Sequence, residues 1–439
     1  MKLKSLALPA AALALSFALP ASAQTEIQWW HSMTGGNGER VNEMAAGFNA
    51  SQKEFKVVPV YKGGYAESMT AAIAAFRAGN APHIVQVFEV GTATMMSAKG
   101  AIKPVYQLMK ESGEKFDPKQ YVSAVAGYYT DRKGNMLSFP FNSSTVVFYI
   151  NKDAFKKAGL DPEKAPKTWK EFAAVAGKLK ASGQECVYTT GWPSWVHVEN
   201  FSAWHNLPIG TLENGMGGLD TVFKINSPKH VEHLQMLVDF TKNGWFTYAG
   251  RQNQAEAKFF SGECAMLTSS SSALDKINAS AKFPFSVNFM PYDDSIKGAP
   301  QNAIIGGASL WVLGGKKPAE YKGVAQFLNY LSSPELQAKW HQGSGYVAIT
   351  YAAAELTEKS GFYKTHPGAD VAMKELNLHP PTANSKGLRF GNFVQGRTVI
   401  EEEMEAALGG KKSAQAAMDD AVKRGNEILR KFQATVKEE

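Results

Sequence analysis

Residues 84–92 read Ile-Val-Gln-Val-Phe-Glu-Val-Gly-Thr, and this stretch decides the fold class. Its apolar run from Ile84 to Val90 predicts a buried strand, and a helix-period segment from Glu67 to Ala78 precedes it. Further upstream, Ile27–Trp30 and Phe55–Tyr61 are two more apolar runs. A second helix-period segment lies between them, and one of its faces carries Val41, Met44, Ala45 and Phe48. Strands that alternate with helices at this spacing predict βαβ units and a parallel sheet.

The same alternation continues along the rest of the chain. The β-rich runs that predict further strands are Thr145–Ile150, Cys186–Thr190, Cys264–Thr268 and Ala308–Leu313. Thr168 with Glu171 three residues later predicts a capping box, and Ser333-Pro334 predicts the start of another helix. A helical pattern over residues 397–432 is interrupted at Gly409-Gly410. Because 439 residues exceed what one core usually holds, we expect more than one domain.

The composition is that of an ordinary globular protein, with 44% hydrophobic and 20% charged residues. The formal net charge is +7, and the basic residues are dispersed among acidic ones. The chain lacks the basic stripe and the interleaved aromatic and basic residues that characterise nucleic-acid binders. We therefore expect no nucleic-acid partner.

The first 23 residues have the pattern of a cleavable export signal. Lys2 and Lys4 form a positive n-region, Leu6–Leu19 is an apolar stretch, and Ala21-Ser22-Ala23 is a small-residue cleavage site. We expect this signal peptide to be removed, so that the mature chain begins at Gln24. No later stretch approaches the roughly 18 apolar residues that a membrane span needs, which predicts an exported, soluble protein.

The chain contains two cysteines, Cys186 and Cys264, and both fall in predicted buried strands. Export makes a disulfide chemically possible, but spacing alone does not establish that the two residues meet. A disulfide and a pair of buried thiols therefore remain equal alternatives. No His-containing signature surrounds either cysteine, so we expect neither to act as a nucleophile.

Glycine, serine and tryptophan gather where the predicted strands end. In open α/β sheets, ligands bind at the carboxyl ends of strands, next to helix N-termini. The segments at these positions are Trp30-His31 with the loop Gly35–Gly38, Glu89–Thr92, Trp192–Trp195, Ser269–Ser272 and Gly306–Ser309. Backbone N–H groups and hydroxyls can hold an anion there without lysine, and tryptophan faces can cover an apolar chain or a quaternary ammonium group. Each segment alone is also typical of turns, caps or core, but together they predict a site for a small polar anion.

Motifs for catalysis and for metal binding are missing from the sequence. His230 and His233 have i, i+3 spacing on a predicted helix, but no further ligand pattern accompanies them, and we expect a pair on the helix surface. His197 and His205 lack a recognisable carboxylate partner. The chain has neither a P-loop nor a Gly-x-Ser-x-Gly elbow. A binding protein without metal or cofactor is therefore favoured over an enzyme.

Longer segments carry a family resemblance. The general ones are Thr145–Asp153, Pro166–Trp169, Phe327–Glu335, and Trp340 with Gly345-Tyr346. On these segments the chain resembles the periplasmic solute-binding subunits of ABC importers, in the branch that includes the sugar-binding proteins. More specific segments are Trp30–Met33, Tyr61–Gly63, Ala72–Pro82, Glu89–Met96, Pro140–Thr145, Glu199–Trp204 and Ala299–Trp311. On these the chain is similar to family members that bind glycerol-3-phosphate, over essentially the whole mature length.

The resemblance implies an α/β fold of the type II periplasmic binding proteins, with a ligand cleft between two lobes joined by hinge crossovers. Lobe 1 is then expected to comprise residues 24–143 and 303–346, and lobe 2 residues 144–302 and 347–439. The resemblance also implies a periplasmic monomer, not an enzyme, that delivers its ligand to the permease and ATPase subunits of an importer.

Nine ligand-binding residues follow from the resemblance, position by position. They are Tyr65, Glu89, Ser144, Trp192, Trp195, Ser270, Gly307, Tyr346 and Arg397. The implied ligands are sn-glycerol-3-phosphate and glycerophosphodiesters such as glycerophosphocholine. We expect Arg397 to hold the phosphate in a charge-assisted contact, helped by the two serines and the Gly307 N–H. Glu89, with Tyr65, suits the glycerol hydroxyls, and the two tryptophans should cover the carbon chain.

Other functions remain possible from the sequence. An oligosaccharide-binding protein of the same fold would use the tryptophans as stacking platforms and Glu89 for hydroxyls, although Arg397 and the serines argue against a purely neutral sugar. An exported phosphodiesterase would normally need a metal cluster, and none is found. A structural surface protein is disfavoured because the chain has no repeats and no anchor.

Overall fold

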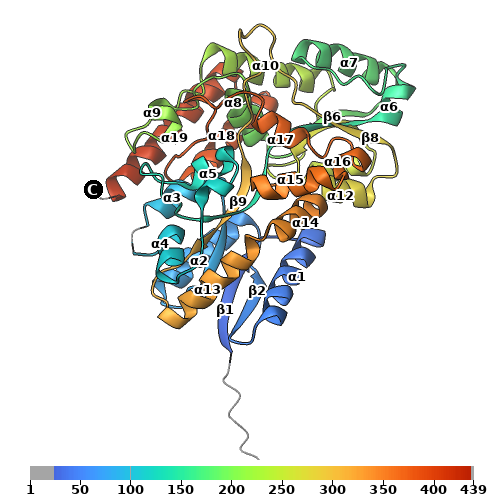
Figure 1. The fold of residues 1–439 in the computed structure, drawn as a ribbon. Coiled ribbons are helices and arrows are strands. Elements are labelled where there is room, and N and C mark those ends of the chain that lie inside the picture. The colour runs from blue at the N-terminus through green and yellow to red at the C-terminus, as the bar shows by residue number, and fades with distance from the viewer. Residues whose placement is uncertain (1–23, 99, 437–439) are drawn as a thin grey trace, which may run out of the picture.

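Two lobes, each built around one β-sheet, make up the computed structural model (Figure 1). The structure describes residues 24–98 and 100–436, so the predicted signal peptide lies outside the described residues. Within the described part, no helix is long and apolar enough to cross a membrane.

The sheet of the first lobe has the strand order β2-β1-β3-β9-β4. Its strands are β1 (Thr25–His31), β2 (Phe55–Tyr61), β3 (Ile84–Phe88), β4 (Phe139–Ser144) and β9 (Gly306–Val312). β1 pairs in parallel with β2 and β3, as predicted. β9 runs antiparallel to both β3 and β4, so the prediction of a parallel sheet is wrong at this strand. The reason is topological. The chain leaves the first sheet at the end of β4 and returns from the second lobe at the same edge, so β9 begins where β4 ends and runs in the opposite direction.

Helices α1 (Gly35–Ser51), α2 (Tyr65–Arg77) and α13 (Pro318–Leu331) accompany the first sheet. The face of α1 predicted from its period is the buried one, with Val41 and Phe48 among its core residues. The expected glycine loop at residues 35–38 is wrong, because these glycines already form the first turn of α1.

The sheet of the second lobe has the order β6-β7-β5-β8. Its strands are β5 (Val146–Asn151), β6 (Cys186–Thr190), β7 (Cys264–Ser270) and β8 (Phe285–Asn288). β6 and β7 are parallel, whereas β5 is antiparallel to both β7 and β8, so the prediction of parallel strands is also wrong at β5. Helix α7 (Trp169–Ala181) begins with the predicted capping box, in which the Thr168 hydroxyl accepts from the Glu171 N–H at 3.1 Å.

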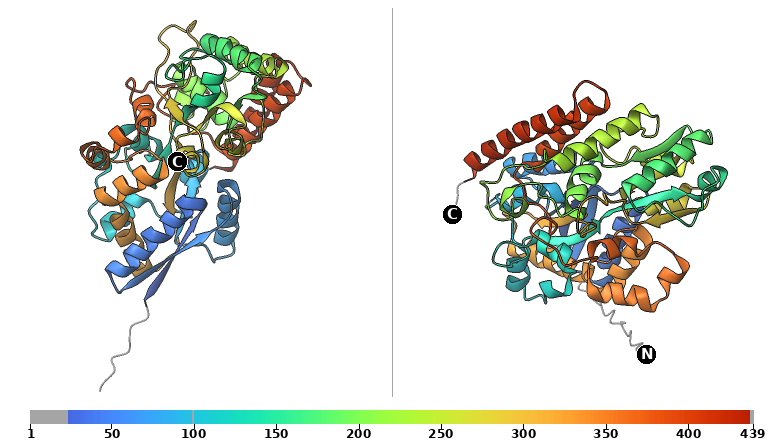
Figure 2. Two further views of the ribbon diagram at one scale, coloured as in Figure 1. Left: turned by 90° about the vertical axis from the view of Figure 1, so that its right-hand side faces the viewer. Right: turned by 90° about the horizontal axis from the view of Figure 1, so that it is seen from above.

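Three long helices cover the second lobe: α10 (Pro228–Lys242), α18 (Phe393–Leu408) and α19 (Ala414–Thr435). They pack against one another, as Figure 2 shows for the red C-terminal helices. The remaining elements are η1 (Glu89–Gly91), α3 (Thr92–Met96), α4 (Val105–Glu111), η2 (Pro118–Gln120), α5 (Ser123–Tyr129), α6 (Lys152–Lys157), the π-helix η3 (Trp195–Asn200), α8 (Phe201–Trp204), α9 (Thr211–Asn214), α11 (Glu256–Phe260), α12 (Ala273–Ser280), α14 (Pro334–Ser344), α15 (Tyr351–Lys359), α16 (Phe362–Thr365) and α17 (Val371–Leu376).

The chain crosses between the sheets where β4 ends and β5 begins. Ser144 is the last residue of β4 and Val146 the first of β5, so only Thr145 separates the two sheets. The chain returns between β8 and β9, and the Thr145 hydroxyl donates to the Ile304 carbonyl at 2.8 Å. This hydrogen bond joins the two segments in which the chain passes between the lobes, so they lie next to each other. The predicted lobe boundaries at 143/144, 302/303 and 346/347 stay predictions.

Cys186 and Cys264 form a disulfide within the second sheet. They are the first residues of β6 and β7 and lie directly opposite each other in the parallel ladder, with their Cα atoms 4.5 Å apart. The alternative of two buried thiols is therefore wrong. The sequence could not decide between the two because the pairing depends on the register of two strands from distant parts of the chain.

Replacing both cysteines by alanine should lower the free energy of unfolding by about 2–4 kcal/mol. The bridge joins residues 78 positions apart, and its loss enlarges the set of conformations open to the unfolded chain. Urea denaturation of the oxidised wild type and the double variant measures the difference. An unchanged unfolding midpoint would contradict a stabilising role.

Candidate functional site

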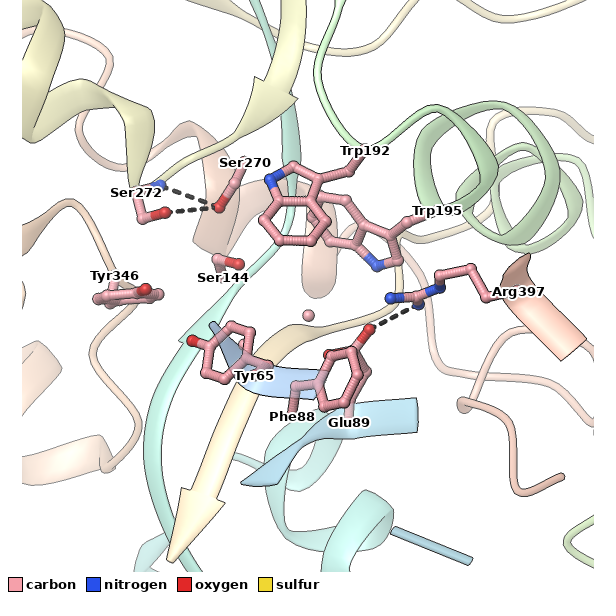
Figure 3. Close-up of a pocket in the computed structure, with 12 residues that line it drawn as sticks. Tyr65, Phe88, Glu89, Ser144, Trp192, Trp195, Ser270, Ser272, Tyr346 and Arg397 are labelled. Carbon is pink, nitrogen blue, oxygen red and sulfur yellow. Dashed lines mark hydrogen bonds and ion pairs between the residues drawn. The ribbon is translucent and has the colours of Figure 1, made fainter. Parts of the chain in front are cut away.

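A pocket of about 380 Å³ lies where the two lobes meet (Figure 3). Its lining residues are Tyr65, Phe88, Glu89, Ser144, Trp192, Trp195, Ser270, Ser272, Gly306, Gly307, Tyr346 and Arg397. The structure thus brings all nine residues expected from the sequence to one pocket, although their role in binding stays a prediction. Phe88, Ser272 and Gly306 are additional, and each lies next to or near a predicted position.

The site lies at the carboxyl ends of β3, β4, β6 and β7, which is the edge expected from the sequence. Glu89 follows β3, Ser144 and Ser270 end β4 and β7, and the tryptophans follow β6. Gly307 reaches the same edge from the opposite direction, at the amino end of β9, because β9 is antiparallel to its neighbours. The expectation that this glycine follows the carboxyl end of a strand is therefore wrong.

Arg397, on α18, lies at one end of the pocket between two carboxylates. Its Nε and Nη2 donate to the two oxygens of Glu199 at 2.9 and 2.7 Å, and Nη2 also donates to Oε1 of Glu89 at 2.6 Å. All three side chains are buried. Burial raises the pKa of Glu89; Arg397 opposes this shift and Glu199 adds to it. With two carboxylates around one guanidinium, this end of the pocket is not a cationic site.

Glu199 is the residue that sequence reasoning missed as a functional group. It does not line the pocket but holds Arg397 with both carboxylate oxygens from η3. The only signal was its place at the start of Glu199–Trp204, one of the segments that carry the family resemblance. Nothing in that segment showed what the carboxylate contacts.

The opposite end of the pocket is lined by hydroxyl groups (Figure 3). The hydroxyls of Ser270 and Ser272 are 2.8 Å apart, and the Ser270 hydroxyl accepts from the Ser272 N–H at 3.2 Å. Ser144 and Tyr346 add two more hydroxyls. Among the described residues that line the pocket, Glu89 is the only acidic one, and it lies at the far end.

A chain of buried amides fixes Tyr65 at the hydroxyl end. Gln86 Nε2 donates to Asn142 Oδ1 at 2.6 Å, and Asn142 Nδ2 donates to the Tyr65 hydroxyl at 2.9 Å. The Tyr65 ring also stacks on Phe88, with centroids 5.2 Å apart. Burial raises the pKa of Tyr65 well above its usual value. The hydroxyl accepts from Asn142 and keeps its own proton.

Trp195 presents a hydrogen-bond donor as well as an apolar face. Its Nε1 is buried and has no hydrogen-bond partner among the residues that the structure describes, and it points into the pocket beside Arg397 (Figure 3). The ring lies against the backbone of β9, where a Cβ on Gly306 would come within 2.5 Å of Trp195 Cζ2. Only glycine leaves room for this ring. The sequence predicted the apolar cover but not the donor.

Gly307 satisfies a second steric constraint. Its φ of +91° is in the left-handed region, and a Cβ there would lie 1.9 Å from the carbonyl oxygen of Asn142. A side chain at this position would push β9 away from β4 and open the wall of the pocket.

The hydroxyl end opens into a wider cleft of about 1060 Å³. The cleft and the pocket share Tyr65, Trp192, Ser272 and Tyr346. Trp192 has a φ of +52°, an uncommon conformation for a residue with a side chain. The Arg397 end is therefore the inner end of the site, and Trp192 lies at the passage between the pocket and the cleft.

His197, His205, His230 and His233 form a buried cluster beneath η3, so the expectation of a surface pair is wrong. His197 Nδ1 and His233 Nε2 are 3.0 Å apart, and His230 Nε2 lies 2.8 Å from the Ser202 hydroxyl. The helix face that carries His230 and His233 is the one that packs inward. In the described part of the chain, no group of three or more His, Cys, Asp or Glu residues is arranged to hold a metal ion.

Comparisons with known proteins place the chain among binding proteins. Residues 43–371 match the model of the bacterial extracellular solute-binding protein family. The chain belongs to this family. It is 54% identical over 438 residues to the sn-glycerol-3-phosphate-binding periplasmic protein UgpB of Pectobacterium atrosepticum, covering 99% of this chain and 98% of that one. It is 56% identical over 423 residues to the protein of the same name from Yersinia pseudotuberculosis, covering 96% of each.

Solved structures agree with this assignment at the level of the fold. UgpB from Mycobacterium tuberculosis, in complex with glycerophosphocholine, aligns with a TM-score of 0.78 at 20% identity, over 93% of this chain and 99% of that one. Maltose-bound MalE3 of T. maritima aligns with a TM-score of 0.74 at 16% identity, over 92% and 99%. The predicted type II periplasmic binding protein fold is confirmed.

The histidine cluster should make the stability of the protein depend on pH. Burial lowers the pKa of His197 to about 3 and that of His230 to about 4. Between about pH 6.5 and 4 the unfolded chain therefore binds more protons at these residues, and their contribution to stability falls as the pH falls. Burial raises the pKa of Glu256 and Glu401 to about 7, so the contribution of these carboxyls to stability rises as the pH falls. Because the two effects oppose each other, the contribution of one histidine is measured as the difference in slope between wild type and a variant.

In His197→Gln the slope of unfolding free energy against pH should be lower by up to about 1.4 kcal/mol per pH unit between pH 4 and 6.5. Urea denaturation at several pH values measures it, and the carboxyl contributions cancel in the comparison with wild type. Parallel slopes for the two proteins would show that His197 is not held neutral in the folded state.

Proposed function

We propose that the protein is the periplasmic substrate-binding subunit of an ABC importer, which captures sn-glycerol-3-phosphate and glycerophosphodiesters such as glycerophosphocholine. It would pass them to the membrane permease and ATPase subunits, as a monomer and after removal of residues 1–23. Relatives named for sn-glycerol-3-phosphate binding are 53–56% identical over nearly their whole length. The observation that carries the proposal is the convergence of the nine expected ligand residues on one pocket.

The glycerol end of the ligand is assigned to the inner end of the pocket. Arg397 already has two carboxylate partners, and Glu89 with Arg397 can accept from and donate to neighbouring hydroxyls. Arg397 Nη1 forms no hydrogen bond with the described residues, and Figure 3 shows one guanidinium nitrogen directed into the pocket. A diol fits such a mixture of acceptors and donors, and a phosphate beside two carboxylates would be repelled.

The phosphate is assigned to the hydroxyl end, which revises the role expected for Arg397. Ser144, Ser270 and Tyr65 offer hydroxyl donors there, and Glu89, the only carboxylate among the described residues that line the pocket, lies at the other end. This end leads into the wider cleft. A diester could therefore extend its second substituent outward past Trp192, whose ring suits a choline group, without changing the contacts of the glycerol.

Ligand binding would favour the closed arrangement of the lobes. Glu89 follows β3 of the first sheet and Tyr65 begins α2, which packs against β3, whereas Ser270 ends β7 of the second sheet and Trp195 begins η3. A ligand that contacts both sets binds the closed form better than an open one and shifts the population toward it. The importer would then distinguish loaded from empty protein by its shape.

An oligosaccharide-binding protein is the alternative function. The paired tryptophans favour it, and a maltose-bound protein is among the structures with this fold. The inner pocket is lined by aromatic rings and buried side chains on several sides, which favours a compact ligand over an extended sugar chain.

Isothermal titration calorimetry of the refolded, ligand-free mature protein separates the two functions. Glycerol-3-phosphate, glycerophosphocholine and maltose are titrated separately, because a co-purified ligand would otherwise mask binding. We expect 1:1 binding of both phosphate esters and no binding of maltose. Binding of maltose, with no binding of either ester, would show that the substrate assignment is wrong.

Trp195→Phe should weaken the binding of both esters about tenfold, because a smaller aromatic face remains while the unpartnered N–H of the indole is lost. Trp311→Phe is the matched control, since Trp311 Nε1 is also buried without a partner among the described residues but lies in the core of the first lobe. Equal affinities for Trp195→Phe and wild type, measured by calorimetry, would remove the donor role.

A further inference from the structure

Glu199 is a buried carboxylate that the proposed contacts with ligand do not use. It is 0% exposed and lies in η3, a π-helix, an irregular element that often occurs at functional sites. Both of its oxygens bond to Arg397. A carboxylate buried in this way costs several kcal/mol unless it is paired, so its presence behind the pocket calls for an explanation.

The contact fixes the direction of the guanidinium. Glu199 occupies Nε and Nη2 from the side, and Glu89 takes a further contact with Nη2. Nη1 then faces the pocket (Figure 3). Glu199 does not touch the pocket itself and therefore acts on the ligand only through Arg397 and through its charge.

The charge around the pocket follows from the same contacts. The two carboxylates of Glu89 and Glu199 carry more negative charge than the single positive charge of Arg397 offsets. The groups that face the cluster from the elements packed around it are Tyr65 of α2, Tyr128 and Tyr129 of α5, and Glu401 of α18. Burial raises the pKa of each of the three tyrosines, so they stay neutral. No further cation among the described residues forms an ion pair with Glu89 or Glu199.

We infer that Glu199 is a positioning residue that also sets ligand selectivity: its charge lowers the affinity for doubly charged phosphomonoesters relative to singly charged phosphodiesters. A monoester carries about one and a half to two negative charges at pH 7, because its second pKa is about 6, whereas a diester carries one. The carboxylate repels the monoester more strongly in the low dielectric of the closed site. This inference rests on the proposed function and names the part of the site that divides its two ligand classes.

The test compares Glu199→Gln with wild type by calorimetry at pH 8 and pH 5, with glycerol-3-phosphate and glycerophosphocholine as probes. Looser positioning of Arg397 lowers the affinity for both ligands by the same factor, whereas loss of the Glu199 charge changes the ratio of the two affinities. At pH 8 the ratio of the two affinities should shift about tenfold toward the monoester. At pH 5 the shift should disappear, because the monoester then carries a single charge.

Two variants accompany the test. Glu199→Asp retains the charge and should keep the wild-type ratio even where both affinities fall. Glu402→Gln removes a carboxylate on α18 that pairs with Arg424 and should leave both affinities unchanged. If Glu199→Gln does not fold, the wild type still tests the inference, since a monoester affinity that does not gain on the diester affinity between pH 8 and pH 5 contradicts it.

An unchanged ratio in folded Glu199→Gln at pH 8, or an equal shift at both pH values, overturns the inference. Failure of the wild type to bind either ester overturns the proposed function instead, so the two failures are distinguishable.

Discussion

One guanidinium between two buried carboxylates ties the site to the fold. Arg397 and Glu199 come from the second lobe and Glu89 follows a strand of the first, so the Arg397–Glu89 ion pair exists only when the lobes are close together. Each of these charges would be costly if it were buried without its partners. The need to keep all three paired therefore couples the position of the lobes to the direction of Arg397 and, through it, to the inner end of the pocket.

Close backbone packing makes the other wall of the pocket. Gly306 leaves room for the Trp195 ring, and Gly307 lets β9 approach β4 beside Asn142. Asn142 in turn bonds to Tyr65 and Gln86. A side chain at either glycine would thus displace an aromatic ring or a buried hydrogen-bonded chain, and both form part of the surface that a ligand would meet.

The π-helix η3 connects this site to the core of the second lobe. It carries Trp195 and Glu199 toward the pocket and His197 toward the buried histidine cluster. The hydrogen bonds of His197 to His233 and to Tyr188 hold the inner side of this short element. Acid that charges the histidines would therefore act on the segment that presents the indole donor and orients Arg397.

The sequence by itself determined the elements that local patterns encode and the edge at which they converge. Periodicity predicted β1, β2, β3 and the buried face of α1, and the capping box at Thr168 predicted the start of α7. Family resemblance supplied the nine lining residues. Tertiary structure alone decided the direction of β9, the disulfide, the burial of the histidines and the partners of Arg397. Glu199 and Glu89 are 198 and 308 residues away from Arg397 in the chain, and no local pattern records which distant carboxylate will neutralise a buried charge.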